Sequence, residues 1–401
     1  MKATVRTFQS GCGDCIFLIL EDTTNGDKRH IMIDCGRFTS DIKLFVKQDL
    51  GMKLDILIVS HYDDDHIAGV IDMLSDIEFK DLYIGKILYN CFQDYDSATA
   101  KRIQNDNKEL LDKYAANLKN GNNSYGTKIS APQASCLCLL LRANEKWFLG
   151  WERHILTEGE TVRVDSDSKW GELYVLSPSC ESLAELKHDF VKEYVKCVHE
   201  LPPQDSFENQ DAYWEMLLRI TSSKSRLRER IPVNSSIITK RFLEKKAMID
   251  PDESGITPPN KASLALIWEC NGKKILLGGD AIASQLYKAI SNRYSENQVW
   301  FEAIKIPHHG SKNNMSNVLS SFIDSEHYFL TGGKKGEGPN YETLAKIILH
   351  PLNTNTAIRM IHYNRIVNLT ELQRLIKDEN VNLMDSCNAK LTNENEYTFE
   401  Y

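Results

Sequence analysis

The chain has 401 residues, of which 42% are hydrophobic and 26% are charged, and its formal net charge is −8. Such a chain can bury a full core and has room for one large α/β domain with insertions or for two domains. A protein that coats long duplex nucleic acid usually carries a basic surface, so the acidic balance argues against that class. A small or single-stranded phosphodiester that is bound locally stays compatible with it.

Ten cysteines are scattered along the chain. Because the first residues contain no leader-like apolar segment, we expect reduced thiols in a cytoplasmic protein. No apolar run approaches the ~18 residues of a membrane span, so no span is predicted.

The N-terminal part has the pattern of short strands separated by polar turns. Apolar and β-branched residues predict strands at 3–8, 15–20, 30–33, 54–60 and 81–88. Helical spacing is found at 39–50 and again just after His66. A charged helix is predicted at 97–120, and further strands at 135–142 and 173–177.

Residues 182–246 differ in character, because they are helical in pattern and rich in Lys, Arg and Glu. We predict that they form a helical insertion within a single domain that spans residues 1–401. Alternation of strands and helices resumes afterwards, with strands at 263–269, 274–277 and 301–306 and a helix at 281–293. The order of elements predicts an α/β fold.

The strand at 54–60 leads directly into a run of metal-ligand side chains, namely His61, Asp63, Asp65 and His66. Open α/β sheets place reactive groups at the carboxyl ends of strands. Imidazole and carboxylate ligands suit zinc, manganese or iron. A surface turn or a calcium loop is the alternative, but calcium takes oxygen ligands and the run lacks the pattern of an EF-hand. The run therefore predicts a metal site.

Two later strands end in similar side chains. The segment 274–280 ends in two glycines and Asp280, and the segment 304–311 contains His308 and His309. Each has an ordinary explanation by itself, since Gly-Gly-Asp is a common turn and a histidine can form a hydrogen bond in the core. Three such clusters at strand ends in one chain indicate one shared metal site.

The order of these motifs resembles the metallo-β-lactamase superfamily, and most closely its competence-type (ComEC-like) branch. The matching segments are Ser-His-x-Asp-x-Asp-His-x-x-Gly at 60–69, Gly-Asp at 279–280 and Pro-His-His-Gly-Ser at 307–311, with further matches at 11–14, 33–36 and 260–263. The resemblance covers most of 1–90 and 135–365 and leaves the insertion unmatched. It implies a four-layer αβ/βα sandwich with two divalent ions between the loop edges of the two sheets.

Carried over by position, the resemblance implies that His61 and Asp63 hold one ion, that Asp65, His66 and His308 hold the second, and that Asp280 bridges them. Asp65 and His309 are the predicted catalytic residues, with His309 protonating the leaving group or, alternatively, supporting a ligand. With one imidazole at the first ion, Mn²⁺ is favoured and Zn²⁺ is the alternative.

The sequence departs from the wider superfamily at two places. Asp63 stands where many members have histidine, and Asn260 lies near the place of another missing histidine. Asn260 either binds the substrate or a water at the ions, or shapes its loop. The glycine-rich segment 332–338 lacks the pattern of a P-loop, yet it follows a strand near the expected site. Lys334 and Lys335 are therefore candidate contacts for an anionic substrate.

These features favour a metal-dependent hydrolase, foremost a phosphodiesterase or nuclease that acts on nucleic acid or a nucleotide. The competence-type relatives carry this domain beside a membrane channel and are implicated in degrading a DNA strand. One alternative is a hydrolase of a small ester, lactone or phospho-compound. Another is a metal-bearing subunit that acts mainly through a protein partner bound by residues 182–246.

Overall fold

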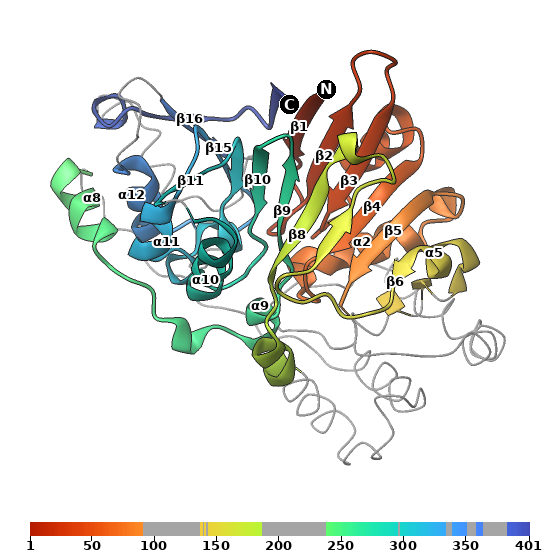
Figure 1. Cartoon of the computed structure of the whole chain (residues 1–401), viewed down its shortest axis with the longest axis horizontal. Helices are drawn as coiled ribbons and strands as arrows, with labels where there is room; N and C mark the ends of the chain where they lie inside the picture. The colour runs from red at the N-terminus through yellow and green to blue at the C-terminus, as the bar shows by residue number, and fades with distance from the viewer. Residues whose placement is uncertain are drawn as a thin grey trace.

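The chain forms two mixed β-sheets that pack against each other, with helices on their outer faces (Figure 1). The computed structural model describes residues 1–90, 137–186 apart from 139 and 142, 238–333 apart from 296, 339–350, 358–363 and 383–401. Within these residues, no helix is long and apolar enough to cross a bilayer.

The first sheet has seven strands in the order β17-β1-β2-β3-β4-β5-β6. They are β1 (Lys2–Thr7), β2 (Ile16–Glu21), β3 (Lys28–Ile33), β4 (Lys53–Val59), β5 (Tyr83–Tyr89), β6 (Trp151–Glu152) and β17 (Glu396–Glu400). Pairing is antiparallel from β17 to β3 and parallel from β3 to β6. The five strands predicted before residue 90 are confirmed as β1 to β5, with bounds within two residues.

The second sheet has eight strands in the order β16-β15-β14-β12-β10-β9-β8-β7. They are β7 (Thr161–Arg163), β8 (Glu172–Ser177), β9 (Ala265–Cys270), β10 (Lys273–Leu277), β12 (Ala303–Lys305), β14 (His327–Leu330), β15 (Arg359–Tyr363) and β16 (Ala389–Thr392). Pairing is antiparallel from β7 to β10 and parallel from β10 to β16. A separate parallel pair joins β11 (Val299–Trp300) to β13 (Ile323–Asp324).

The helices form two outer layers. Over the first sheet lie α1 (Ser40–Leu44), the π-helical η1 (Phe45–Asp49), α2 (Asp64–Ser75) and α5 (Glu145–Gly150), and over the second lie α8 (Lys240–Ala247), α10 (Ala283–Arg293), α11 (Asn317–Phe322) and α12 (Tyr341–Ile348). Single turns are η2 (Ile77–Phe79), η3 (Ser168–Trp170), η4 (Glu253–Gly255), α9 (Pro258–Lys261), η5 (Pro307–Gly310) and η6 (Lys312–Asn314).

The period-two pattern of the strands separates three buried cores. Leu18 of β2 and Leu266 of β9 share the core between the sheets. Because neighbouring side chains on a strand point to opposite faces, Phe17 turns outward and lies 5.0 Å from Phe45 of η1, measured between ring centroids. Leu276 of β10 lies in the third core, with the helices over the second sheet. The four-layer α/β sandwich predicted from the sequence is therefore the observed architecture.

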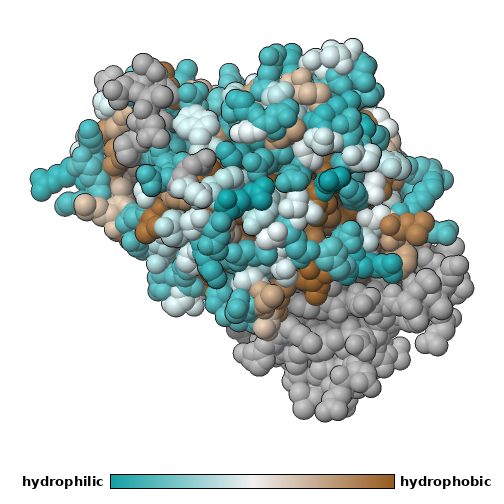
Figure 2. Space-filling model, viewed as in Figure 1, coloured by the Kyte–Doolittle hydropathy of each residue, from teal (hydrophilic) through white to brown (hydrophobic). Residues whose placement is uncertain are grey.

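The described part of the face in Figure 2 is mostly polar. Hydrophilic residues cover most of the described part of the face in Figure 2, and hydrophobic residues form small groups among them. The apolar residues of the strands and helices thus go mainly into the three cores.

One predicted strand is wrong. Residues 137, 138, 140 and 141 are helical, although a strand is predicted at 135–142. Leu137, Cys138 and Leu141 are buried in the core over the first sheet, and their spacing suits one face of a helix. A short apolar run has no periodicity that separates a buried strand from a buried helix, and here packing decides the outcome.

The predicted insertion at 182–246 is described at its two ends, because residues 187–237 lie outside the described residues, as does the charged helix predicted at 97–120. At the C-terminal end, Leu243 of α8 is fully buried and Lys246 Nζ lies 2.7 Å from Glu342 Oε1 of α12. Residues 240–246 therefore belong to the helical layer over the second sheet. At the N-terminal end, residues 182–186 are helical and Leu186 is buried in the core over the first sheet, and residues 187–237 stay a prediction.

Candidate metal centre

The candidate metal centre lies where the carboxyl ends of β4, β10 and β12 come together. Leu264 N donates a hydrogen bond to Ser60 O (2.8 Å), which joins the segment before β9 to the end of β4. His308 N donates to Gly279 O (3.0 Å), which joins the ends of β12 and β10. The three ligand clusters predicted from the sequence therefore share one site.

The first cluster is carried by the start of α2. The helix begins at Asp64, inside the motif and not after His66 as predicted, and Asp63 is its extended N-cap residue. Carboxylates at a helix N-terminus interact favourably with the helix dipole, which explains why consecutive aspartates begin a helix here. Asp65 and His66 consequently occupy the rigid first turn.

A glycine turn holds that first helical turn against the first sheet. Asp14 N donates to Asp65 O at 3.0 Å. Gly13 lies so close that a Cβ atom at this position would collide with Asp65 O. The Gly-x-Gly-Asp turn at 11–14 therefore fits directly beneath the main chain of a predicted ligand.

The second cluster ends in a completely enclosed aspartate. Gly279 has φ +49°, and a Cβ atom there would lie 2.7 Å from Leu264 O. Glycine meets both the positive φ and the close approach. Asp280 N donates to Ser263 Oγ at 3.0 Å, and the Asp280 side chain is buried.

The third cluster contains two strained histidines. His308 and His309 have φ values of 45° and 52°, in the left-handed region that residues with a Cβ rarely adopt. Two such residues in succession persist because surrounding contacts enforce them. Their rings diverge, with centroids 5.7 Å apart. The His308 side chain is 21% exposed, whereas that of His309 is 1% exposed.

The carboxylate of Asp280 is the centre of the cluster. Four Nε2 atoms surround its Oδ2 atom: those of His66 at 3.3 Å, His308 at 3.6 Å, His61 at 3.9 Å and His309 at 4.0 Å. Two further carboxylates lie beside different rings, with Asp63 Oδ2 3.7 Å from His61 Nε2 and Asp65 Oδ2 3.7 Å from His309 Nε2. The structure thus brings together all six predicted ligands and His309.

Each ring is held from behind through its Nδ1 atom. Asp34 Oδ2 lies 2.8 Å from Nδ1 of His66, and Asp14 Oδ1 lies 3.0 Å from Nδ1 of His309. Ser60 Oγ lies 3.0 Å from Nδ1 of His61. Partners of this kind fix the orientation of metal-binding histidines and leave Nε2 for the ion.

The tautomer of His308 follows from a neighbouring amide. Asn314 Nδ2 donates to Asp280 O and Ala281 O, both at 3.0 Å, so its Oδ1 atom must face His308 Nδ1, 2.9 Å away. His308 therefore carries its proton on Nδ1. Asn260 Nδ2 lies 3.3 Å from Nε2 and 3.5 Å from Nδ1 of the same ring. The predicted residue Asn260 is thus placed beside the cluster.

The electrostatics show how strongly this cluster attracts positive charge. Burial opposes the charged form of His66, but Asp280 and Asp34 outweigh it and hold the pKa of His66 well above its usual value. Burial also opposes the charge on His309, yet Asp14 and Asp280 raise its pKa to about 10. Against burial, His66 and other histidines lower the pKa of Asp280. A divalent cation that binds the imidazole nitrogens must displace these protons, so protons and metal ions compete for the same atoms.

Unpaired buried atoms match a metal centre. Nε2 of His61, His66 and His309 and one oxygen each of Asp63 and Asp280 are buried without a hydrogen-bond partner. Two atoms that each lie about 2.1 Å from one ion at a tetrahedral angle are about 3.4 Å apart. The histidine Nε2 atoms lie at similar distances, 3.3 to 4.0 Å, from Oδ2, the other oxygen of Asp280. Ligand atoms of His61, His66 and Asp280 all lie within 4.8 Å of one another. The residues therefore fit divalent ions.

Two predicted substrate contacts, Lys334 and Lys335, lie outside the described residues. The segment that precedes them does border the cluster, because Gly333 N donates to Cys12 O at 2.6 Å. A Cβ atom on Gly332 would lie 2.6 Å from Nδ1 of His309.

Sequence reasoning missed the residues that support the ligands. Asp14, Asp34 and Ser263 fall inside motifs noted in the sequence, so their position was the available signal. Asn314 and Lys305 carry no such signal. Lys305 is buried, and its Nζ atom lies 2.5 Å from Asp14 Oδ2. Its pKa is raised, since Asp14 and Asp280 outweigh the effect of burial.

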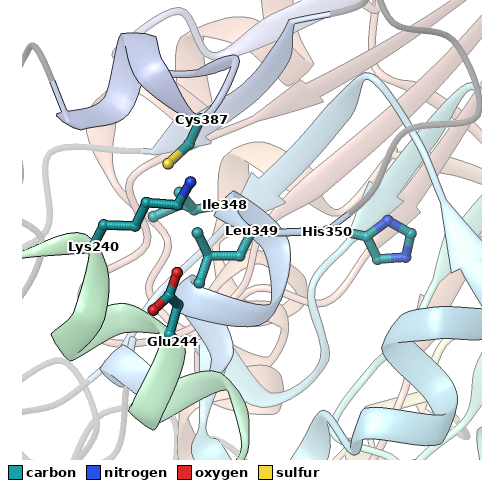
Figure 3. A pocket seen from close by; sticks show the side chains of 6 residues that line it. All are labelled: Lys240, Glu244, Ile348, Leu349, His350 and Cys387. Carbon is teal, nitrogen blue, oxygen red and sulfur yellow. The ribbon is translucent and has the colours of Figure 1, made fainter.

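A pocket of about 270 Å³ lies away from this centre, between α8, the end of α12 and Cys387 (Figure 3). Lys240 and Glu244 line it from α8, and the His350 ring points away from the other labelled side chains. None of its lining residues belongs to the metal cluster.

Comparison with known proteins supports the assigned fold and the interpretation of the cluster as a metal site. No curated protein matches the chain. Residues 15–144 match the model of the metallo-beta-lactamase superfamily, a range that includes β2 to β5 and the first ligand cluster. Asp280, His308 and His309 lie beyond this range but complete the same cluster. The superfamily consists mostly of hydrolases that bind divalent metals. The chain thus has the metallo-β-lactamase fold and carries a metallo-beta-lactamase superfamily domain, which implies a metal-dependent hydrolase.

Proposed function

We propose that this protein is a two-metal phosphodiesterase that acts on nucleic acid or a nucleotide. The observation that carries the proposal is the convergence of four imidazole Nε2 atoms on Asp280, with Asp63 and Asp65 beside different rings. When bound, a pair of divalent ions lowers the pKa of water and neutralises charge that develops on a phosphoryl oxygen. The resemblance of the motifs to the competence-type branch supports the same substrate class.

The distances favour one change in the predicted ligand set. Asp65 Oδ2 lies 3.7 Å from Nε2 of His309, and the His309 ring is buried with its Nδ1 atom held by Asp14. We therefore assign Asp65, His66 and His309 to one ion, and His61 and Asp63 to the other, with Asp280 between them. His309 replaces His308 in this set.

His308 then takes the proton-transfer role that was predicted for His309. Its side chain is the more exposed of the two, and Asn314 orients it so that the Nε2 lone pair faces the centre. A ring held in one tautomer at the open side of a site can accept a proton and pass it on. Asn260, which lies against the same Nε2 atom, would position the substrate or His308 itself.

Two further contacts remain part of the proposal. Lys334 and Lys335 follow Gly333, whose N–H donates a hydrogen bond to Cys12 O beside the cluster, and their charge suits a phosphate.

The insertion at 182–246 would contribute recognition of a polymer or a protein partner. Replacing 187–237 by a short linker should leave metal binding intact and reduce turnover of a polynucleotide more than turnover of a small diester. Equal losses on both substrates would indicate a structural role.

The test uses metal-free protein that is supplied with Mn²⁺, Mg²⁺ or Zn²⁺. The substrates are labelled single-stranded DNA, duplex DNA, RNA and bis-p-nitrophenyl phosphate. A simple ester, p-nitrophenyl acetate, and a simple lactone test the alternative substrate classes. Asp280→Asn serves as the inactive variant and His327→Gln, at a distant site, as the matched control. Cleavage of diesters that requires metal and Asp280 supports the proposal. Turnover of the ester or lactone without turnover of any diester refutes it, and the acidic net charge of −8 makes a small substrate the second candidate.

A further inference from the structure

Lys305 is a buried lysine that lies behind the candidate metal centre. It is the last residue of β12, which runs between β10 and β14, and its side chain is 2% exposed. Burial of an ammonium group is unfavourable unless charge partners and hydrogen bonds compensate for it. The surroundings of this group therefore show what it holds in place.

The ammonium group lies near three groups on two turns of the centre. Its Nζ atom lies 2.5 Å from Asp14 Oδ2, on the turn between β1 and β2. It donates to Gly279 O at 2.9 Å and lies 3.7 Å from Asp280 Oδ1, both on the turn after β10. Lys305 thus joins the turn beneath Asp65 to the turn that carries the central aspartate.

In each of two carboxylates, the two oxygen atoms face different partners. The Oδ1 atom of Asp280 faces Lys305, and its Oδ2 atom faces the histidines. Asp14 directs Oδ2 toward Lys305, and its Oδ1 atom lies 3.0 Å from Nδ1 of His309. Each carboxylate thus has one oxygen toward Lys305 and the other toward a histidine.

The ion pair with Asp14 compensates for the buried charge of Lys305, but charge alone does not give a lysine a favourable effect on ion binding. A cation beside a cation-binding site lowers the affinity of the site, because like charges repel at short range. A benefit that outweighs this repulsion must come from geometry. The orientation of Asp280 and of the Asp14–His309 pair supplies that benefit.

We propose that Lys305 is a positioning residue of the metal centre, which orients the carboxylates of Asp280 and Asp14 so that Asp280 and His309 bind the ions. The inference rests on the proposed function only in that the centre binds two ions. Lys305 itself touches neither substrate nor ion in this scheme.

The test measures the number of ions bound per chain and their affinity, by metal analysis and by competition with a chelator, using Mn²⁺. The variants are Lys305→Met, Asp14→Asn and the combination of both. Lys346→Met is the matched control, since Lys346 is also buried and its Nζ atom donates to Ile249 O, away from the centre. The double variant removes a paired positive and negative charge together, so it keeps a folded reference if Lys305→Met alone unfolds.

We expect Lys305→Met to bind Mn²⁺ at least about tenfold more weakly than the wild type, as when a supporting partner of a ligand is removed. We also expect the double variant to bind at least about tenfold more weakly than Asp14→Asn alone. Equal affinity of the double variant and Asp14→Asn overturns the proposal, since Lys305 would then act through Asp14 alone. Tighter binding in Lys305→Met also overturns it, because repulsion would then be the dominant effect. A wild-type protein that binds two ions but cleaves no diester refutes the proposed function and leaves this inference standing.

Discussion

The carboxylate of Asp34 lies 2.8 Å from Nδ1 of His66, and both side chains are completely buried. The same carboxylate accepts hydrogen bonds from Ser60 N and from Ser60 Oγ, both at 2.7 Å. Three donors thus converge on Asp34, and with Nδ1 held in this way His66 directs its Nε2 atom at Asp280.

Asp34→Asn should therefore weaken Mn²⁺ binding by about 10- to 100-fold, the usual effect of losing such a partner. Ser60 N donates to Oδ1, whereas Ser60 Oγ and His66 Nδ1 share Oδ2. An amide NH₂ group in either place cannot accept, so at least one hydrogen bond is lost. Asparagine tolerates the φ of 57° at this position, which keeps the backbone comparable. Competition with a chelator measures the affinity. Asp55→Asn is the control, because Asp55 Oδ2 accepts a hydrogen bond from His30 N and not from a ligand of the centre. Unchanged affinity in Asp34→Asn would contradict the role assigned to this pair.

Gly13→Ala should destabilise the protein and impair metal binding, because the new Cβ atom would collide with the main-chain oxygen of Asp65. A rigid helical turn cannot yield as a flexible side chain can, so we expect a loss of about 1–3 kcal/mol in the free energy of unfolding. Gly255→Ala is the matched control, since nothing lies within 4 Å of its added Cβ atom. Urea unfolding of the metal-free proteins measures the difference, and equal stability of the two variants would show that the turn at 11–14 adapts freely.

His308→Gln and His309→Gln should differ in kind. We expect His309→Gln to lose one of two bound ions, because its Nε2 atom lies beside Asp65 and its Nδ1 atom is held by Asp14. His308→Gln should keep both ions and lose turnover by roughly 10²- to 10⁴-fold, the range for a proton-transfer residue. Metal analysis of the two variants separates the roles. Loss of an ion from His308→Gln, with two ions kept in His309→Gln, would restore the assignment predicted from the sequence.

Much of this centre could be predicted because its ligands follow strands. His61, Asp280 and His308 come directly after apolar segments, and carboxyl ends of parallel strands meet at one edge of a sheet. The sheet pairings confirm the parallel arrangement at β3–β4–β5 and at β10–β12–β14. That arrangement accounts for the closeness of Asp280 and His308, which follow neighbouring strands of the second sheet. His61 follows β4 of the first sheet, and it joins them because the two sheets pack against each other.

The division of roles between His308 and His309 could not be predicted, because it depends on the unusual left-handed backbone at both residues. Adjacent residues in an extended strand would point to opposite sides, so sequence position alone says little about which ring enters the centre. Lys305 presents a similar difficulty. An isolated lysine in a strand normally faces water, and its burial becomes evident once β12 is found between two other strands of the sheet.

His327 should make the protein less stable in acid. Burial and the neighbouring His362 lower the pKa of His327 to about 4, below the usual value near 6.5. The folded state therefore takes up this proton less readily than the unfolded state. The associated stability is fully present above pH ~6.5 and is lost as the pH falls through about 4, by up to about 3 kcal/mol.

His327→Gln removes this titration and keeps a donor for Nε2 of His362, which lies 2.9 Å from Nδ1 of His327. The loss of unfolding free energy between pH 7 and pH 4 should be smaller in this variant than in the wild type. Denaturant unfolding of metal-free protein at a series of pH values measures it. Identical pH profiles would show that His327 does not contribute to acid unfolding.

The metal that supports turnover should be Mn²⁺ in preference to Zn²⁺. In the assigned set, the first ion has one imidazole, from His61, together with the carboxylates of Asp63 and Asp280. Oxygen-rich coordination that leaves room for water suits a six-coordinate ion, whereas tetrahedral Zn²⁺ prefers several nitrogen or sulfur donors. Zn²⁺ can still bind tightly, because divalent affinity generally rises from Mn²⁺ to Zn²⁺, so affinity and turnover need separate measurement. Metal-free protein reconstituted with each ion gives both values.

Asp63→His adds a second imidazole and should shift the preference for turnover toward Zn²⁺, with Asp167→His, on an exposed turn, as the control. Faster turnover with Zn²⁺ in the wild type would refute the coordination argument, and the fold and the position of the centre would be unaffected.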